Sequence, residues 1–347
     1  MFWPLFRLLL TLVLAGAAGA LFNLAHSPLP WMIGPMLVTA VGTMAGLPLR
    51  SSHRLRNLGQ WLIGSALGLT FTPAVAEEVG RIAPWTLLGA GWALGMGYLF
   101  FRWLRLRQPQ TDIHTAYFAS VIGGASEMAT FAEQHGARID RVASAHSLRV
   151  MLVVLILPFG YQWAGLHGTD PLSGAGPSAL HPTALIGVGL STAAGALLLH
   201  RLRQPNPWVL GALGVAALLS ATGTVEGTLP AGLTSAAQVL LGTALGTRFR
   251  PEFVRAAPQW LADVALGTLG MIAASAGLAM ALAQFTGLRL ATVLLGNAPG
   301  GMTEMCITAK VLHLGVPAVT AFHMVRYALV LVLTAPIHRR WTAPRRH

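Results

Sequence analysis

Two glutamates stand in matching apolar settings and are the acidic side chains best placed to do chemistry. Glu127 ends the block GGASE at 123–127, and Glu304 ends the block GGMTE at 300–304. Within a membrane an ionised carboxylate costs at least ~2.5 kcal/mol, so it needs a partner or a function. Paired glycines break a helix, and the following serine or threonine can cap a new half-helix whose first turn holds the glutamate. Two such breaks are typical of transporter sites.

A His-x-x-Arg pattern follows each glutamate after the same interval. His146 and Arg149 come after the first block, and His323 and Arg326 come after the second. The i, i+3 spacing places each pair on one helical face. One interpretation is a Glu–Arg ion pair that pins helices together. The other is a pair of arginines that bind an anionic substrate, or a pair that breaks and re-forms during transport, and the sequence leaves both open.

Three amides complete the candidate site. Gln60 and Gln238 each begin a short Gly-rich segment, where a helix-to-helix hydrogen bond is a commoner role than lining a cavity. Asn297 precedes the second Gly-Gly pair, and its counterpart is Ser120, so a polar role there would be asymmetric. The candidate substrate- and ion-binding residues are Gln60, Gly123, Gly124, Ser126, Glu127, His146, Arg149, Gln238, Asn297, Gly300, Gly301, Thr303, Glu304, His323 and Arg326.

The sequence predicts neither a metal site nor a cofactor. The chain has 12 histidines and a single cysteine, Cys306, but no His-x-His or His-x-x-x-His pair. Such spacing would be expected of a catalytic copper or iron site. No phosphate-binding P-loop pattern occurs either. We therefore expect no catalytic residue, no metal and no cofactor, and a protein that is not an enzyme.

The composition requires a membrane environment for these residues. Hydrophobic residues make up 54% of the chain and charged residues only 10%, with a mean hydropathy of +0.62. A soluble domain carries about 25% charged residues. The net charge of +12 comes from short basic clusters between apolar stretches, which is the pattern of cytoplasmic loops rather than of a nucleic-acid surface. The expected partners are the lipid bilayer and a small solute, with no nucleic acid and with homo-oligomerisation open.

The chain contains two copies of one repeat. The segment QWLIGSALG at 60–68 returns as QVLLGTALG at 238–246, and the Gly-Gly and His-x-x-Arg blocks recur at a spacing of 177 residues. Residues 1–26 resemble a signal peptide, but AAGAL at 17–21 recurs at 193–197, which makes this segment the first repeat helix. The predicted organisation is a first membrane repeat at 1–163, a connecting loop at 164–182, and a second repeat at 183–347 with a short basic tail.

The basic clusters predict the orientation of each copy. They alternate with loops that lack net positive charge, such as Thr72–Gly80, if each Gly-Gly segment dips into the membrane and returns. The fold class expected is an all-α polytopic membrane protein. It has two inverted repeats, each with about five spanning helices and one broken, re-entrant segment. Both termini are then cytoplasmic. The candidate cytoplasmic loops are Arg50–Arg56, Arg102–Arg107, Arg138–Arg141, Arg201–Arg203, Arg248–Arg255 and His338–Arg346.

These doubled blocks resemble the AbrB-type membrane protein family of bacteria, from about Leu8 to about Pro336. The resemblance implies a multi-pass protein of the bacterial inner membrane. Some members are labelled as an ammonia monooxygenase, which the missing metal ligands oppose, and others as regulators of gene expression. The residues favour a secondary transporter or permease for a small solute, anionic if the arginines bind it, with proton or sodium coupling through a glutamate. The alternative is a membrane-bound regulator that affects gene expression indirectly without transport.

Overall fold

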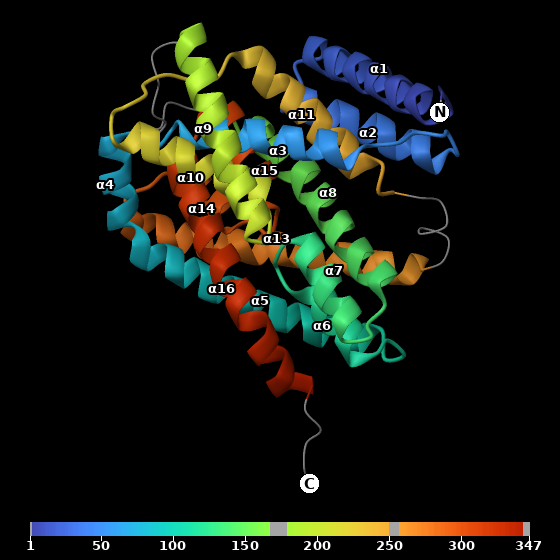
Figure 1. Cartoon of the computed structure of the whole chain (residues 1–347). Helices are drawn as coiled ribbons and strands as arrows, with labels where there is room; N and C mark the ends of the chain where they lie inside the picture. The colour runs from blue at the N-terminus through green and yellow to red at the C-terminus, as the bar shows by residue number, and fades with distance from the viewer. Residues whose placement is uncertain (1, 167–178, 250–256, 343–347) are drawn as a thin grey trace. The chain divides into compact units, whose positions relative to one another are not determined.

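The computed structural model describes the chain apart from residues 1, 167–178, 250–256 and 343–347 (Figure 1). Most of the predicted connecting loop 164–182, most of the basic loop Arg248–Arg255 and the end of the basic tail therefore lie outside the described residues. The helices are α1 (Phe2–Leu24), α2 (Pro30–Met44), α3 (His53–Gly68), α4 (Pro73–Arg81), α5 (Ala83–Arg107), α6 (Ile113–Ser120), α7 (Ala125–Gln134), α8 (Ile139–Trp163), α9 (Pro182–Arg201), α10 (Pro207–Ala221), α11 (Ala231–Gly246), α13 (Pro258–Thr286), α14 (Leu290–Asn297), α15 (Met302–Val311) and α16 (Val316–Thr342).

The all-α class is confirmed for these residues, and the helix order repeats along the chain. Helices α2 and α10 both have 15 residues, α3 and α11 both have 16, α6 and α14 both have 8, and α7 and α15 both have 10. Several segments interpreted as loops are wholly or partly helical, such as Arg102–Arg107, which forms the end of α5. The segment Thr72–Gly80, interpreted as a loop, forms most of α4, where Arg81 pairs with Glu77 and Glu78 one turn away.

Five helices in the described part of the chain are long and apolar enough to cross a membrane. They are Leu5–Leu24, Ile139–Trp163, Pro182–Arg201, Pro258–Thr286 and Val316–Trp341. About ten spans were expected. Helices of 15 or 16 residues, such as α2 and α11, are only about 22–24 Å long, shorter than the ~30 Å hydrocarbon core. The structure therefore supports a membrane protein and five of the expected spans.

The Pro-Trp pairs that recur in the two copies, at 30–31 and 207–208, have a local explanation. Pro30 and Pro207 occupy the first turns of α2 and α10, where the missing N–H of proline costs nothing. The preceding residues, Leu29 and Asn206, have left-handed φ values of 46° and 51°. Each pair thus marks the sharp entry into the second helix of its copy.

The chain forms two compact units that are not the two sequence halves. Unit 1 comprises Met1–Arg81, Leu157–Pro251 and Cys306–Pro317. Unit 2 comprises Ile82–Ile156, Glu252–Met305 and Ala318–His347. Each unit takes corresponding helices from both copies of the repeat. Helices α8, α15 and α16 contribute residues to both units.

Unit 1 is built by reciprocal packing of the two copies. Helix α3 packs against α10, and α11 packs against α2. A side chain on Gly64 would overlap the backbone of Val209, and a side chain on Gly242 would overlap the backbone of Met32. These are matching positions in the two copies. The Gly-rich segments therefore serve close helix contact, which small residues allow.

Unit 2 contains an antiparallel pair made of equivalent helices, α5 and α13. Asp263, near the start of α13, bonds with Arg107 and Trp103, near the end of α5. Further along, the ring of Phe100 occupies the space where a side chain on Gly267 would lie. Because residue numbers rise along one helix as they fall along the other, the two equivalent helices run in opposite directions. A buried cluster that includes Trp260 packs within the same unit.

Candidate functional site

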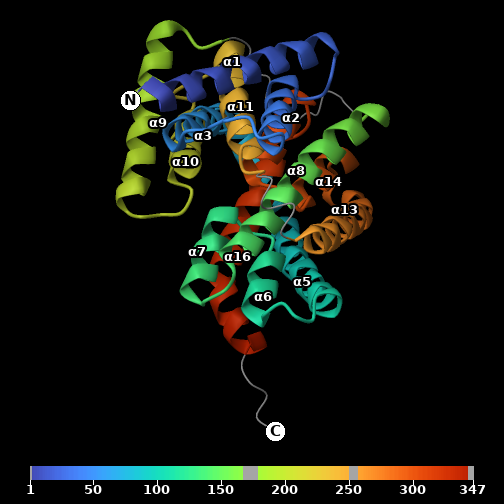
Figure 2. The same cartoon turned by 90° about the vertical axis from the view of Figure 1, so that its right-hand side faces the viewer.

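The first broken segment is a hairpin within unit 2. Near the start of α6, Thr115 Oγ1 accepts a hydrogen bond from the backbone N–H of Arg138, which follows α7, at 2.7 Å. The ring centroids of Phe118, on α6, and His135, directly after α7, lie 5.3 Å apart. Helices α6 and α7 lie side by side in both views (Figures 1 and 2). The segment therefore returns toward its starting point, as the dip-and-return expectation for the Gly-Gly segment requires.

Each glutamate lies in the first turn of the second half-helix. Glu127 is in the first turn of α7 and Glu304 in the first turn of α15. The predicted capping by Ser126 and Thr303 is wrong, because both residues are already inside these helices, and the N-cap of α7 is Gly124. Ser126 is exposed and Thr303 is buried. The acidic group itself, rather than the hydroxyl, faces the helix start.

The second glycine of each pair makes room for the carboxylate. A Cβ on Gly124 would overlap Oε2 of Glu127, and a Cβ on Gly301 would overlap Oε2 of Glu304. Relative to the N-cap at Gly124, Glu127 occupies the third helical position, from which a glutamate reaches back toward the backbone of the cap. The Gly-Gly-x-x-Glu spacing therefore leaves the space that the glutamate carboxylate occupies beside the second glycine.

The first His-x-x-Arg pair contacts the end of α6, the half-helix that precedes the break. Arg149, 2% exposed on α8, donates hydrogen bonds to the carbonyls of Val121 at 2.8 Å and Ala119 at 2.5 Å. His146 Nε2 lies 2.9 Å from the carbonyl of Phe118, and the guanidinium lies over the ring of Phe100. These carbonyls end α6, where they lack helical partners and carry the negative end of the dipole. A cation there stabilises the interrupted helix.

The second copy repeats this arrangement at matching positions. Arg326 donates to the carbonyls of Ala298 at 2.6 Å and Gly300 at 2.7 Å, at the end of α14. His323 Nε2 lies 3.0 Å from the carbonyl of Leu295, and its Nδ1 lies 2.7 Å from Arg326. With Nε2 donating to the carbonyl, Nδ1 is left to accept from the guanidinium. The motif thus holds the end of a half-helix in both copies, a role that its spacing alone did not reveal.

The two breaks face each other through reciprocal contacts. A side chain on Gly123 would meet Val330 of α16, and one on Gly300 would meet Val153 of α8. Val153 and Val330 occupy equivalent places in the two copies, as the two glycines do. Unit 2 therefore gathers both breaks into one candidate site.

Tyr327 is a site residue that the sequence reasoning missed. Its hydroxyl donates a 2.9 Å hydrogen bond to Oε1 of Glu127, so an acid of the first copy is held by the last helix of the second. The counterpart of Tyr327 is Val150, which cannot donate such a bond. The sequence feature that could have identified it is a tyrosine directly after Arg326 in an apolar helix. The site is consequently asymmetric between the copies.

The three candidate amides are not together. Gln60 and Gln238 lie in the middle of α3 and α11 rather than at their starts, and both belong to unit 1. Gln60 donates to Asn206 at the start of α10 at 3.1 Å, which is the helix-to-helix bond expected for it. Asn297 belongs to unit 2, where its Nδ2 donates to Val293 and its buried Oδ1 has no hydrogen-bond partner among the described residues. Only Asn297 shares a unit with the breaks.

No group of three or more His, Cys, Asp or Glu side chains in the described part of the chain is arranged to hold a metal ion. The side chains gathered at the breaks offer charges and hydrogen bonds. The positive groups are buried guanidiniums, and the acidic groups sit on half-helix starts. Such an arrangement can bind ions and small charged solutes.

The fold and this site define a class, a polytopic helical membrane protein with two broken segments gathered in one unit. Residues 31–342 match the family described as "Transition state regulatory protein AbrB", and the chain belongs to that family. It is 27% identical to "Uncharacterized protein YhjN" of Bacillus subtilis (strain 168), over 94% of this chain and 91% of that protein. It is 23% identical to "Putative regulator AbrB" of Escherichia coli (strain K12), over 94% of both chains.

Proposed function

We propose that this protein is a secondary transporter whose broken segments bind a small anionic solute. The observation that carries this proposal is the pair of buried arginines gathered in unit 2. Among the described residues, the partners of Arg149 are two carbonyls and an aromatic ring, and its Nε is buried without a hydrogen bond. Two buried cations in one unit favour a negative ligand, since an uncompensated buried charge is costly. A solute carboxylate or phosphate would supply that charge.

An inverted relation between the copies belongs to this proposal. The opposite directions of α5 and α13, which are equivalent helices, support a two-fold axis perpendicular to them. If both helices cross the bilayer, that axis lies in the membrane plane. The reciprocal contacts of Gly123 with Val330 and of Gly300 with Val153 support the same relation. Inverted repeats with broken helices allow a site to open alternately to the two sides.

The glutamates are proposed to couple transport to a proton or a sodium ion. Glu127 is partly buried, lies at the positive end of α7 and is held by Tyr327. Glu304 occupies the same place on α15. Because Tyr327 holds Glu127 and the residue equivalent to Tyr327 in the first copy is Val150, the two acids have different surroundings, and we expect Glu127→Gln and Glu304→Gln to affect flux unequally. Reconstituted variants should lose the pH or sodium dependence of flux, and unchanged dependence in the double variant would remove both acids from the mechanism.

A thermal-shift screen of the purified protein against carboxylates, phosphate and sulfate tests the anion site. A binding anion should raise the melting temperature of the parent. Arg149→Lys retains the charge but loses the two-pronged geometry, so it should weaken the shift. Arg138→Gln removes an exposed arginine paired with Asp140 and serves as the control that keeps the shift. An anion that stabilises the Arg149 and Arg138 variants to the same extent would contradict an arginine site.

The name of the Escherichia coli relative favours a second candidate function, a membrane-bound regulator without transport. The two functions give different outcomes for the same variants. If regulation is a consequence of solute flux, Glu127→Gln combined with Glu304→Gln should remove the pH or sodium dependence of flux and of the transcriptional response together. A transcriptional response that persists in a variant without flux would instead support the regulator.

A further inference from the structure

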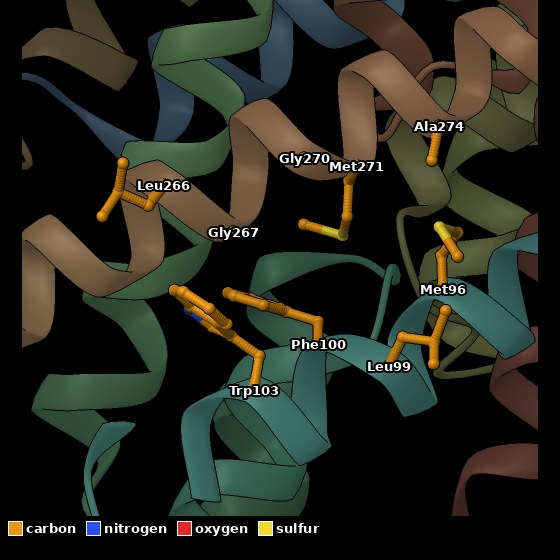
Figure 3. Close-up of a pocket in the computed structure, with 9 residues that line it drawn as sticks. All are labelled: Met96, Leu99, Phe100, Trp103, Leu266, Gly267, Gly270, Met271 and Ala274. Atoms are coloured by element: carbon orange, nitrogen blue, oxygen red, sulfur yellow. The ribbon is translucent and has the colours of Figure 1, made fainter. Parts of the chain in front are cut away.

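An apolar groove runs between α5 and α13 within unit 2. Its volume is about 290 Å³, and its lining consists of apolar side chains and glycines. Phe100 and Met271 project into it, with Trp103 at one end and Met96 at the other (Figure 3). Gly270 adds no side chain, and no atom lies within 4 Å of the position that its Cβ would take. The groove is therefore open space that a flexible apolar chain can occupy.

The dimensions and exposure of the groove match one lipid chain. From Leu266 to Ala274, α13 rises about 12 Å, close to the ~15 Å hydrocarbon depth of one leaflet. Leu99 and Leu266 on its two rims are 56% and 53% exposed. Apolar rims of this kind indicate an apolar neighbour. A slot open to the side, one leaflet deep and without polar lining groups, suits an acyl chain better than a water-soluble ligand.

The end of the groove at Trp103 is polar and basic. Trp103 Nε1 donates to the carbonyl of Asp263 at 3.1 Å, and Arg107 lies over the indole ring, 5.6 Å from its centroid. Arg107 Nε pairs with Oδ1 of Asp263 at 2.9 Å, which offsets the negative charge of this buried carboxylate. The side chain of Arg107 is itself 55% exposed. Two more arginines, Arg102 and Arg105, stand in the same last turns of α5. The net charge at this end is positive.

We infer that this groove binds an anionic phospholipid, with an acyl chain between α5 and α13 and the headgroup phosphate at Arg107. A tryptophan followed by exposed arginines is the usual arrangement at the membrane–water interface. The basic end of α5 is also the end that the charge rule assigns to the cytoplasm, where anionic lipids attract arginine. A second copy of the chain is the other candidate occupant, but a single slot about 12 Å long with a charged end fits a lipid better than a helix face.

The test compares phosphatidylglycerol with phosphatidylcholine of the same acyl chains, bound to the purified full-length protein and counted by native mass spectrometry. Gly270→Leu should fill the groove and reduce phosphatidylglycerol binding at least tenfold. Gly277→Leu is the matched control, because it lies two turns further along the same face of α13, beyond the groove, and its Cβ also meets open space. The control should bind the lipid as the parent does, and both variants should unfold at similar temperatures.

A variant of Arg107 separates the contribution of the positive charge to lipid binding from that of the shape of the groove. Arg107→Gln keeps a donor for Asp263 but removes the positive charge, and it should reduce the preference for phosphatidylglycerol about fivefold while leaving phosphatidylcholine unchanged. Equal lipid binding by the Gly270→Leu variant and the parent would overturn the inference. So would a loss of dimers without a loss of lipid, which would assign the groove to a second copy. The readouts do not involve flux, so their outcome is independent of the proposed transport function.

Discussion

Replacing Gly124 by alanine should destabilise the protein through one side chain, the carboxylate of Glu127. The backbone at Gly124 has φ −68° and ψ 132°, which alanine adopts without strain. The added methyl would overlap Oε2 of Glu127, so the carboxylate must move and lose its bond from Tyr327. A hydrogen bond to a charged group contributes about 1.5–3 kcal/mol. Alanine restricts the unfolded chain and returns about 0.4–1 kcal/mol. The expected net loss is about 0.5–2.5 kcal/mol.

The assay is a double-mutant cycle in unfolding free energy, measured by SDS titration in mixed micelles with circular dichroism. In the Glu127→Ala background the methyl has nothing to displace, so Gly124→Ala should be neutral or slightly stabilising. The coupling between the two positions should be about 1.5–3 kcal/mol. Gly91→Ala on α5, whose Cβ meets open space, controls for the general effect of alanine. A coupling below about 0.5 kcal/mol would refute the account of the Gly-Gly spacing.

Two further predictions concern helix ends and helix contacts. Arg149→Lys should lower the melting temperature, because one ammonium cannot replace both hydrogen bonds to the carbonyls of Ala119 and Val121. Each lost bond costs about 1.5–3 kcal/mol. A melting temperature equal to that of the parent would show that these carbonyls do not depend on the two-pronged guanidinium. Gly242→Ala should reduce the folded fraction on size-exclusion chromatography, because its methyl would meet backbone rather than a flexible side chain. Gly214→Ala, which meets open space, should not, and equal behaviour of the two variants would contradict the reciprocal packing.

The sequence predicted the breaks because they depend on residues that are neighbours in the chain. A glycine pair followed by an acid three positions later places Glu127 and Glu304 in the first turns of half-helices without any information from elsewhere. The capping role given to Ser126 and Thr303 was wrong by two residues, since the helices begin earlier than the hydroxyl positions suggested. Five of the about ten expected spans have helices long and apolar enough to cross a membrane, and the others remain a prediction, since hydropathy alone does not separate a short packed helix such as α2 from a spanning one.

Contacts between distant segments escaped the sequence reasoning. Tyr327 and Glu127 are 200 residues apart, and Gln60 and Asn206 are 146 apart. Nothing in either local pattern specifies the partner, because a hydrogen bond depends on which helix faces pack together. The same limit applies to Arg149, whose position near two carbonyls follows from the approach of α8 to the end of α6.

The sequence by itself determined the duplication, the helical class, the membrane character and the placement of each acid beside a glycine pair. These properties follow from composition and from short-range spacing, which act within a few residues. Only the tertiary structure decided that corresponding helices of the two copies share each compact unit, that both breaks meet in unit 2, and that the arginines hold half-helix ends. Those outcomes depend on the packing of surfaces far apart in the chain, where steric fit selects one pairing among many.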